Sequence, residues 1–360
     1  MLRAGLIGLP ATGKTTLFSL LTRAGADGAT GRFGHNEAHI GTAAVRDDRL
    51  DRLTALYEPQ RRVPATVAFA DVAGAATPRS LVDVGAYREA HALLHVVRAF
   101  HADDVPHAAG GVDAARDAQA VEDELILADL EVTERRLERI ERDKRKGAGG
   151  NLDREAGVLA RCREALEDGS PIRSLELERD DARTLRGFQF LSAKPLLLVI
   201  NLDEDDIGEA DRAVELTGLS GMLSQAHVRA VPVCAKIELE IAQLDAEDAR
   251  MFLADLGLRE PGLHRIVRAA YELLGYISFF TVGKDECRAW SIANGSLAPE
   301  AAGAIHTDMQ RGFIRAEVVS YENLTGRGSL TACRNHGEVR LEGKEYVVQD
   351  GDVINFRFAT

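Results

Sequence analysis

The chain has 360 residues, 45% of them hydrophobic and 28% charged, which is the balance of a globular protein with two or three domains. A formal net charge of −13 excludes attraction of nucleic acid to the whole surface, so DNA binding is not expected, although a local basic patch is compatible with this charge. The four cysteines form no CxxC pair and no apolar run is long enough for a bilayer, which argues against a disulfide framework, a zinc site and a membrane span and predicts a cytoplasmic protein.

The first predicted strand, residues 2–9, leads into a glycine-rich turn and then into a helix. Residues 8–15 read GLPATGKT, which matches GxxxxGK[ST] without a mismatch. In this pattern backbone N–H groups close around phosphates at a helix N-terminus, the lysine contacts the β and γ phosphates, and the hydroxyl ligates Mg²⁺. We therefore predict a nucleoside triphosphate site in which Lys14 contacts the phosphates and Thr15 holds Mg²⁺. The residues expected around the phosphates are Pro10, Ala11, Thr12, Gly13, Lys14, Thr15 and Thr16.

Helical stretches lie between several of the later strands, and this alternation predicts an α/β fold with a mostly parallel sheet covered on both faces. These later strands are expected at residues 67–70, 95–99, 195–200 and 231–233. Asp71-Val72-Ala73-Gly74 ends the first of them and has the DxxG form expected opposite a phosphate loop. Asp71 is expected to hold Mg²⁺ through water, and Gly74 to offer its N–H to the γ-phosphate.

Two further loops stand where GTPases recognise the base. Residues 201–204 occupy the place of NKxD, with Leu202 for the lysine and Glu204 for the final aspartate, and residues 234–236 resemble the SAK element. Each piece alone is also typical of an ordinary loop, but their order favours a G-domain. Because the two changed residues weaken guanine selection, we expect ATP to bind at least as well as GTP. The predicted base contacts are Asn201, Leu202, Glu204, Cys234, Ala235 and Lys236.

Between the third and fourth strands, residues 112–190 show the pattern of a helical hairpin. An apolar seam recurs at steps of four and three, at Ile126, Leu130, Thr133, Leu137 and Ile140. A basic run at residues 142–146 and four small residues then precede a returning helix. We expect the hairpin to project from the sheet domain, with packing on that domain as the alternative. Its basic tip is either a contact for RNA phosphates or a solvated charged turn.

From about residue 276 the chain changes to short strands, which predicts a small separate α+β domain. The strands are expected at residues 277–282, 288–292, 313–319 and 353–358, with a short helix at 301–306. The predicted organisation is a nucleotide-binding domain over residues 1–275, interrupted by the hairpin at 112–190, and a second domain over 276–360.

With these elements in order, almost the whole chain resembles the YchF family, also called Obg-like ATPases. The most specific stretches are residues 49–51, 59–61, 95–98, 256–263, 288–290, 301–303, 305–308, 312–317 and 350–353. The resemblance implies a G-domain interrupted by a coiled coil, followed by a β-grasp TGS domain. It also implies hydrolysis of ATP in preference to GTP, and association with ribosomes or translation.

The resemblance further implies that a histidine takes the catalytic role of the glutamine of other GTPases. Ala75 follows Gly74 here, and His107, twelve residues beyond His95, matches the family's histidine. The alternative for His107 is a solvated loop residue.

The chain departs from the family at three places around the phosphates. Ala11 replaces an asparagine that helps to coordinate a monovalent cation, His35 stands at the switch I threonine, and residues 75–80 replace a longer glycine- and lysine-rich switch II. Two functions follow as alternatives: a slow, switch-like ATPase that acts on a ribosome or RNA, and a nucleotide-gated binding module with negligible turnover. Leu202 and Glu204 disfavour a true GTPase.

Overall fold

The structure is a computed structural model with two compact units. It describes residues 3–22, 29–33, 36–72, 83–103, 105–107, 110–146 and 151–359. The first unit lies within residues 1–43 and 68–273, and the second within 44–67 and 274–360. Residues 44–67 thus belong with the C-terminal part of the chain, because their strand pairs with a strand of that part. The local sequence pattern does not indicate this grouping.

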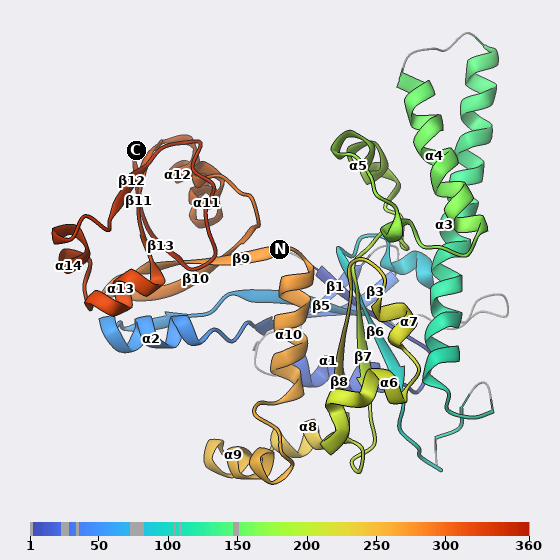
Figure 1. The fold of residues 1–360 in the computed structure, drawn as a ribbon, viewed down its shortest axis with the longest axis horizontal. Helices are drawn as coiled ribbons and strands as arrows, with labels where there is room; N and C mark the ends of the chain where they lie inside the picture. Colours follow the sequence, from blue (N-terminus) through green and yellow to red (C-terminus); the bar gives the residue numbers. More distant parts are fainter. Residues whose placement is uncertain are drawn as a thin grey trace. The chain divides into compact units, whose positions relative to one another are not determined.

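In the part of the chain that the structure describes, seven strands form the sheet of the first unit (Figure 1). They are β1 (Arg3–Ile7), β2 (Ala29–Phe33), β3 (Asn36–Ala44), β5 (Thr66–Val72), β6 (Ala92–Arg98), β7 (Leu196–Asn201) and β8 (Val228–Val233). Their order is β2-β3-β5-β1-β6-β7-β8. The pairs from β5 to β8 are parallel, and β2 pairs antiparallel with β3. The predicted α/β fold with a mostly parallel sheet is confirmed.

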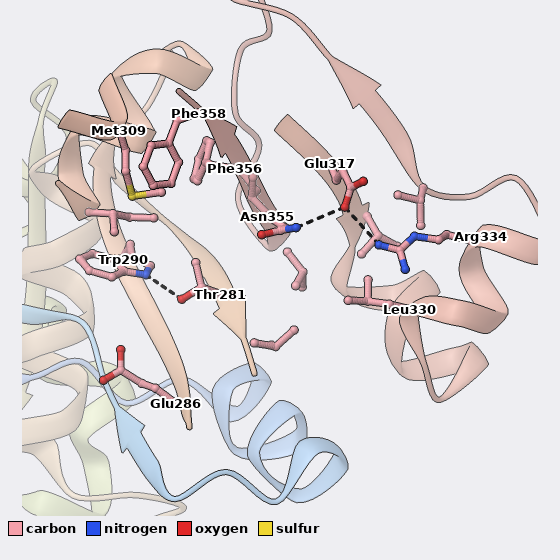
Figure 2. Close-up of a pocket in the computed structure, with 16 residues that line it drawn as sticks. Thr281, Glu286, Trp290, Met309, Glu317, Leu330, Arg334, Asn355, Phe356 and Phe358 are labelled. Atoms are coloured by element: carbon pink, nitrogen blue, oxygen red, sulfur yellow. Dashed lines mark hydrogen bonds and ion pairs between the residues drawn. The ribbon is translucent and has the colours of Figure 1, made fainter. Parts of the chain in front are cut away.

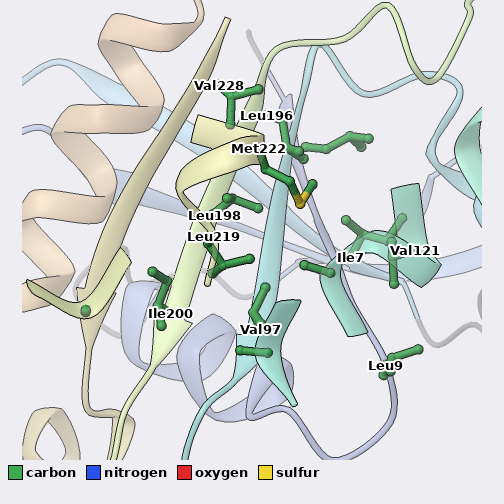
Figure 3. Packing of buried hydrophobic residues seen from close by; sticks show 14 of the residues in the cluster. Ile7, Leu9, Val97, Val121, Leu196, Leu198, Ile200, Leu219, Met222 and Val228 are labelled. Carbon is green, nitrogen blue, oxygen red and sulfur yellow. The ribbon is translucent and has the colours of Figure 1, made fainter. Parts of the chain in front are cut away.

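Helices cover this sheet, so its central strands are apolar throughout. Every residue of β6 and of β7 is buried, as expected for parallel strands with covered faces. Figure 3 shows Ile7, Val97 and Leu198 from neighbouring strands in one core with Val121 and Met222 from helices. Parallel strands end at the same edge of a sheet, and the loops that follow β1, β6, β7 and β8 therefore meet there.

The helices of the first unit follow the strands in alternation. The α-helices are α1 (Lys14–Thr22), α3 (Ala114–Arg145), α4 (Asn151–Glu167), α5 (Arg179–Leu185), α6 (Ala213–Leu216), α7 (Ser220–Leu223), α8 (Ala235–Ile241), α9 (Ala246–Asp255) and α10 (Gly262–Leu273). Short 3₁₀ turns are η1 (Val84–Tyr87), η2 (Ile172–Ser174), η3 (Arg186–Phe188) and η4 (Ile207–Arg212). No helix among the described residues is both long and apolar enough to cross a bilayer.

The predicted hairpin is formed by α3 and α4, which lie side by side and extend away from the sheet (Figure 1). Asp113 caps α3 by accepting a hydrogen bond from the Arg116 backbone N–H at 3.0 Å, and basic residues fill the last turn, as the helix dipole favours. The seam residues Ile126 and Ile140 are buried against Leu159 and its neighbours on α4. Burial of these two apolar stripes against each other stabilises the hairpin.

The second unit is a mixed sheet with helices, in the arrangement of a β-grasp fold. Its strand order is β12-β11-β13-β9-β10-β4. The strands are β4 (Arg61–Val63), β9 (Tyr276–Val282), β10 (Glu286–Ala293), β11 (Phe313–Ser320), β12 (Arg340–Glu342) and β13 (Asp352–Phe358). The helices are α2 (Asp48–Tyr57), α11 (Ala298–Ile305), α12 (Thr307–Arg311), α13 (Tyr321–Arg327) and α14 (Leu330–Asn335). Its core contains Phe279, Phe356 and the face of α11 that carries small side chains.

Candidate nucleotide site

The turn between β1 and α1 has the backbone that its glycines allow. Gly8 has a φ of 149° and Gly13 a φ of 95°, which residues with a Cβ rarely adopt. A Cβ on Gly8 would lie 2.4 Å from the Val96 carbonyl oxygen, and one on Gly13 would lie 2.6 Å from Asn201 Nδ2. Ala11 also has a positive φ, 60°, in the region where asparagine is the better-tolerated residue. Ala11 thus takes a backbone conformation that is less favourable for alanine than for asparagine.

Lys14 is a partly desolvated cation inside this loop. Its Nζ donates to the carbonyl oxygens of Gly8 at 2.8 Å and Leu9 at 2.6 Å. Burial lowers the pKa of Lys14 to about 8, against the opposing effect of the Asp71 charge. An anion placed in the loop would therefore stabilise the charged form of this side chain.

Thr15 and Asp71, the two predicted magnesium ligands, lie together although 56 positions separate them in sequence. The Thr15 hydroxyl donates to Asp71 Oδ2 at 3.1 Å, and Asp71 is buried. The described residues contain no group of three or more His, Cys, Asp or Glu side chains arranged to hold a metal. One carboxylate and one hydroxyl suit Mg²⁺, because in phosphate sites the substrate and water supply the remaining oxygens. His35, Gly74, Ala75 and the rest of residues 75–80 lie outside the described residues.

Asn201 connects the phosphate loop to the second base-recognition element. Its Nδ2 donates to the Thr12 carbonyl oxygen at 3.0 Å, and its Oδ1 accepts from the Ala235 backbone N–H at 3.0 Å. The side chain is buried, and both of its polar atoms are satisfied. One amide thus holds together three segments that are far apart in sequence.

A cavity of about 540 Å³ lies beside this amide, which is a common size for a small-molecule site. Of the residues predicted to bind nucleotide, it is lined by Gly13, Thr16, Asn201, Leu202, Glu204, Cys234, Ala235 and Lys236. Pro10 and Ala11 are exposed on the phosphate turn, whereas Thr12 is buried beneath it and donates to the Leu9 carbonyl oxygen at 3.1 Å.

Five further residues line the cavity and are missing from the sequence-based site. They are Phe100, His101, Ala102, Asp203 and Leu239. The first three belong to the loop that follows β6, which the sheet order places between the loops after β1 and β7. The position of this loop directly after a buried strand could have indicated that it lies near the site. The segments next to it depend on the strand order, which the local sequence does not give.

Two contacts between polar side chains lie at the rim of the cavity. Lys236 Nζ is 2.5 Å from Glu204 Oε2, and this contact raises the pKa of Lys236. Both the backbone N–H and Nδ1 of His101 lie within hydrogen-bond distance of Asp203 Oδ2, at 2.9 and 3.1 Å. The Glu204 carboxylate, which the sequence predicts to face the base, is thus in contact with a lysine of the neighbouring turn.

His107 is not among the residues that line this cavity. Its Nε2 lies 2.7 Å from Asp117 Oδ2 in the first turn of α3, and both side chains are buried, at 8% and 6% exposure. Asp117 also accepts hydrogen bonds from Arg116 Nε at 3.0 Å and Nη2 at 2.8 Å. The structure therefore places this histidine against the base of the hairpin.

The second unit contains a cavity of about 520 Å³ (Figure 2). Aromatic side chains, Trp290 and Phe356 among them, form part of its wall, and Glu317 lies in its polar part. The polar groups bond to one another: Arg334 Nη2 and Asn355 Nδ2 lie 3.1 and 3.3 Å from Glu317 Oε2. No ligand class follows from side chains that already satisfy each other.

Comparison with known proteins gives matches over the full length. Residues 276–359 match the family YchF-GTPase_C, described as "Protein of unknown function (DUF933)". The chain is 41% identical over 364 residues to the "Ribosome-binding ATPase YchF" of Bacillus subtilis (strain 168), which covers 99% of both chains. It is 39% identical over 365 residues to the protein of the same name from Escherichia coli O157:H7, again over 99% of both. Its structure is similar to that of the Schizosaccharomyces pombe YchF GTPase, with a TM-score of 0.87, 28% identity and coverage of 99% of this chain and 97% of that chain.

Proposed function

The chain belongs to the YchF family, and on that premise we propose that this P-loop NTPase is a slow ATPase that acts on ribosomes in the cytoplasm. Two relatives that match it from end to end carry the name ribosome-binding ATPase. The contacts within the site favour the same activity.

The position of Asn201 is the main structural observation that supports this proposal. This one buried side chain fixes the phosphate loop, through Thr12, relative to the turn at Ala235 that borders the cavity. A ligand that fits this arrangement has an anionic end in the loop and a planar end in the cavity. A nucleoside triphosphate has that shape and charge.

On the phosphate side, Lys14 exchanges its bonds to the loop carbonyls for bonds to the β and γ phosphates. Such an exchange is favourable because phosphate oxygens carry charge and carbonyl oxygens do not. Thr15, with Asp71 through water, would hold Mg²⁺, which neutralises charge on the phosphates when it is bound.

On the base side, Leu202 is 5% exposed and offers an apolar surface that packs on either purine. Guanine selection needs a carboxylate that accepts hydrogen bonds from N1–H and the 2-amino group. Glu204 stands there but contacts Lys236, and adenine has neither of those donors. We therefore propose that ATP is preferred modestly over GTP.

His107 is the proposed catalytic residue, and the Asp117 carboxylate lies next to it. The Asp117 carboxylate oxygen, 2.7 Å from His107 Nε2, restrains the position of the buried imidazole ring. With its position restrained in this way, the imidazole is suited to orient or deprotonate the attacking water when the loop approaches the γ-phosphate.

The tip of the hairpin is the proposed contact for ribosomal RNA. Arg142, Lys144, Arg145 and Lys146 are exposed at the end of α3. Their ion pairs are with exposed partners, Lys144 with Asp153 at 2.5 Å and Arg145 with Glu141 at 3.8 Å. Exposed pairs of this kind contribute little, so RNA phosphates can replace the carboxylates.

Turnover and ribosome binding, measured together, test this function. We expect ATP hydrolysis that rises when ribosomes are added, and co-sedimentation with ribosomes that depends on the bound nucleotide. Absence of both nucleotide binding and co-sedimentation would contradict the proposal.

A second candidate function is a nucleotide-gated binding module with negligible turnover. The position of His107 against Asp117, outside the cavity lining, favours it. Nucleotide-dependent co-sedimentation without ribosome-stimulated hydrolysis is the result that this alternative predicts.

A further inference from the structure

Arg98, the last residue of β6, is a charged side chain in an interior position. It is only 2% exposed, and arginine is almost never buried to this extent without partners. It makes no ion pair among the described residues, and its Nη1 has no hydrogen-bond partner there. Burial of a guanidinium is unfavourable unless hydrogen bonds or a charged partner compensate for the lost hydration.

The partners of Arg98 are backbone carbonyls of the loop that follows it. Nε donates to the Phe100 carbonyl oxygen at 3.1 Å, and Nη2 donates to that of Val105 at 3.1 Å. A third carbonyl oxygen, that of Ala102, lies at 3.5 Å from Nη2. The guanidinium also lies over the Phe100 ring, 4.6 Å from its centroid. The Arg98 guanidinium therefore links the backbone at Phe100 and at Val105 to the end of β6.

The same loop forms one wall of the cavity beside the phosphate site. Phe100, His101 and Ala102 line that cavity, whereas Arg98 does not. The loop is also bonded to the end of β7 and the turn after it. The Ala99 N–H donates to the Asn201 carbonyl oxygen at 2.9 Å, and the backbone N–H and Nδ1 of His101 lie 2.9 and 3.1 Å from Asp203 Oδ2. Because the His101 side chain is 80% exposed, solvent screens its contact with Asp203, whereas the buried Arg98 contacts are screened least.

We propose that Arg98 is a positioning residue for the nucleoside part of the ligand. It holds the wall formed by Phe100, His101 and Ala102 in its binding shape before ligand arrives, without touching the ligand. This inference rests on the proposed nucleotide site and assigns two contributions to the binding affinity to different residues. The phosphate loop sets affinity for the triphosphate, and Arg98 sets the added affinity that the base supplies.

Lysine is a poor substitute at this position, for a geometric reason. The guanidinium donates from two separate nitrogens and stacks on a ring at the same time, whereas an ammonium is a point donor without a plane. Arg98→Lys keeps the buried charge and loses the fork, and Arg98→Met removes both while it keeps most of the packing.

The test compares a ligand that has a base with one that lacks it. Binding of ATP and of inorganic tripolyphosphate is measured for the wild-type chain, Arg98→Met, Arg98→Lys and the control Arg265→Met. Arg265 donates to the Pro232 carbonyl oxygen at 2.7 Å and does not line the cavity, so it reproduces the loss of an arginine-to-carbonyl bond elsewhere in the unit.

We expect Arg98→Met to weaken ATP binding by about tenfold and tripolyphosphate binding by less than about twofold. Arg98→Lys should lie between Arg98→Met and the wild type, and Arg265→Met should match the wild type for both ligands. Unchanged ATP binding in Arg98→Met, or an equal loss for the two ligands, would overturn the inference. A wild-type chain that binds neither ligand would instead contradict the nucleotide site itself.

Amide hydrogen exchange on the ligand-free proteins gives a second readout. In Arg98→Met, exchange should rise in residues 99–107 and stay unchanged in residues 8–16. Unchanged exchange in the loop would show that Arg98 does not hold it.

Discussion

The cavity beside the phosphate loop and the cavity around Glu317, which lie in different units, have similar volumes and different chemistry. The first measures about 540 Å³ and the second about 520 Å³. In the second, Glu317 is bonded to Arg334 and Asn355, and Trp290 donates to the Thr281 hydroxyl at 3.0 Å (Figure 2). In the first, the adjoining phosphate loop holds a lysine whose pKa burial has lowered to about 8.

Cavity volume alone therefore does not distinguish a binding site from a cavity without a ligand. A ligand gains little from Glu317, Arg334 and Asn355, because a bond to them would replace one that these side chains already make. A desolvated cation at a helix N-terminus gains from an anion. The electrostatic state of Lys14, and not the size of the neighbouring cavity, therefore distinguishes the first site.

Removal of one cation near each cavity tests whether only the first site binds ATP, and we expect the largest effect here. Lys14→Ala should weaken ATP binding by roughly a hundredfold, since a charge-assisted bond to phosphate is lost. Arg334→Ala, the matched change in the second cavity, should leave ATP affinity unchanged. Calorimetry measures both, and equal affinities for the wild type and Lys14→Ala would contradict the phosphate site.

Catalysis is expected only at the first site, through His107. His107→Ala should lower kcat by roughly a hundredfold and leave ATP affinity nearly unchanged. Single-turnover kinetics with saturating ATP measure the effect. Asp117→Asn should give a smaller loss of kcat, because the ring keeps its position but loses the partner that orients it. Full activity in His107→Ala would show that the family's catalytic residue does not act here.

The lowered pKa of Lys14 predicts a pH dependence that the second cavity cannot produce. Above about pH 8 the free protein loses the lysine proton, and phosphate binding must restore it, so ATP affinity falls as pH rises. Between pH 7 and pH 9 the dissociation constant should increase about tenfold. Lys14→Arg is the control, since arginine keeps its charge over this range. A flat profile for the wild type would show that Lys14 does not titrate there.

The same pKa shift acts on stability in the opposite direction. The folded chain releases the Lys14 proton near pH 8 and the unfolded chain near its ordinary value of 10.5. Stability from this group therefore rises with pH between these two values. Burial also lowers the pKa of Lys194 to about 8, so only the part of the stability trend that Lys14→Arg removes belongs to Lys14.

The smallest expected effect concerns the choice of purine. The wild type should prefer ATP to GTP by about tenfold. Lys236→Met should reduce this preference several-fold, because Glu204 loses its lysine partner and its carboxylate becomes available to guanine. Competition titrations with both triphosphates decide the point, and a hundredfold GTP preference in the wild type would contradict our reading of Glu204.

Much of the fold follows from patterns that are local in sequence. The phosphate loop needs eight consecutive residues, and its glycines are required by positive φ angles within the loop itself. The hairpin follows from apolar steps along α3 that later pack on α4. The strands of the sheet are short apolar runs, and each predicted strand overlaps an observed one. Periodicity and turn chemistry encode such elements within a few residues of one another.

The neighbours of these elements were decided only by the tertiary structure. The sheet order brings the loop of Phe100 and His101 beside that of Asp203, about a hundred positions away. It also joins Asn201 to Thr12, and folding brings His107 to Asp117. Strand order and register are set by burial of whole faces and by long-range pairing, which no local period records. For that reason the sequence predicts the phosphate loop, whereas the wall that Arg98 holds is visible only in the folded chain.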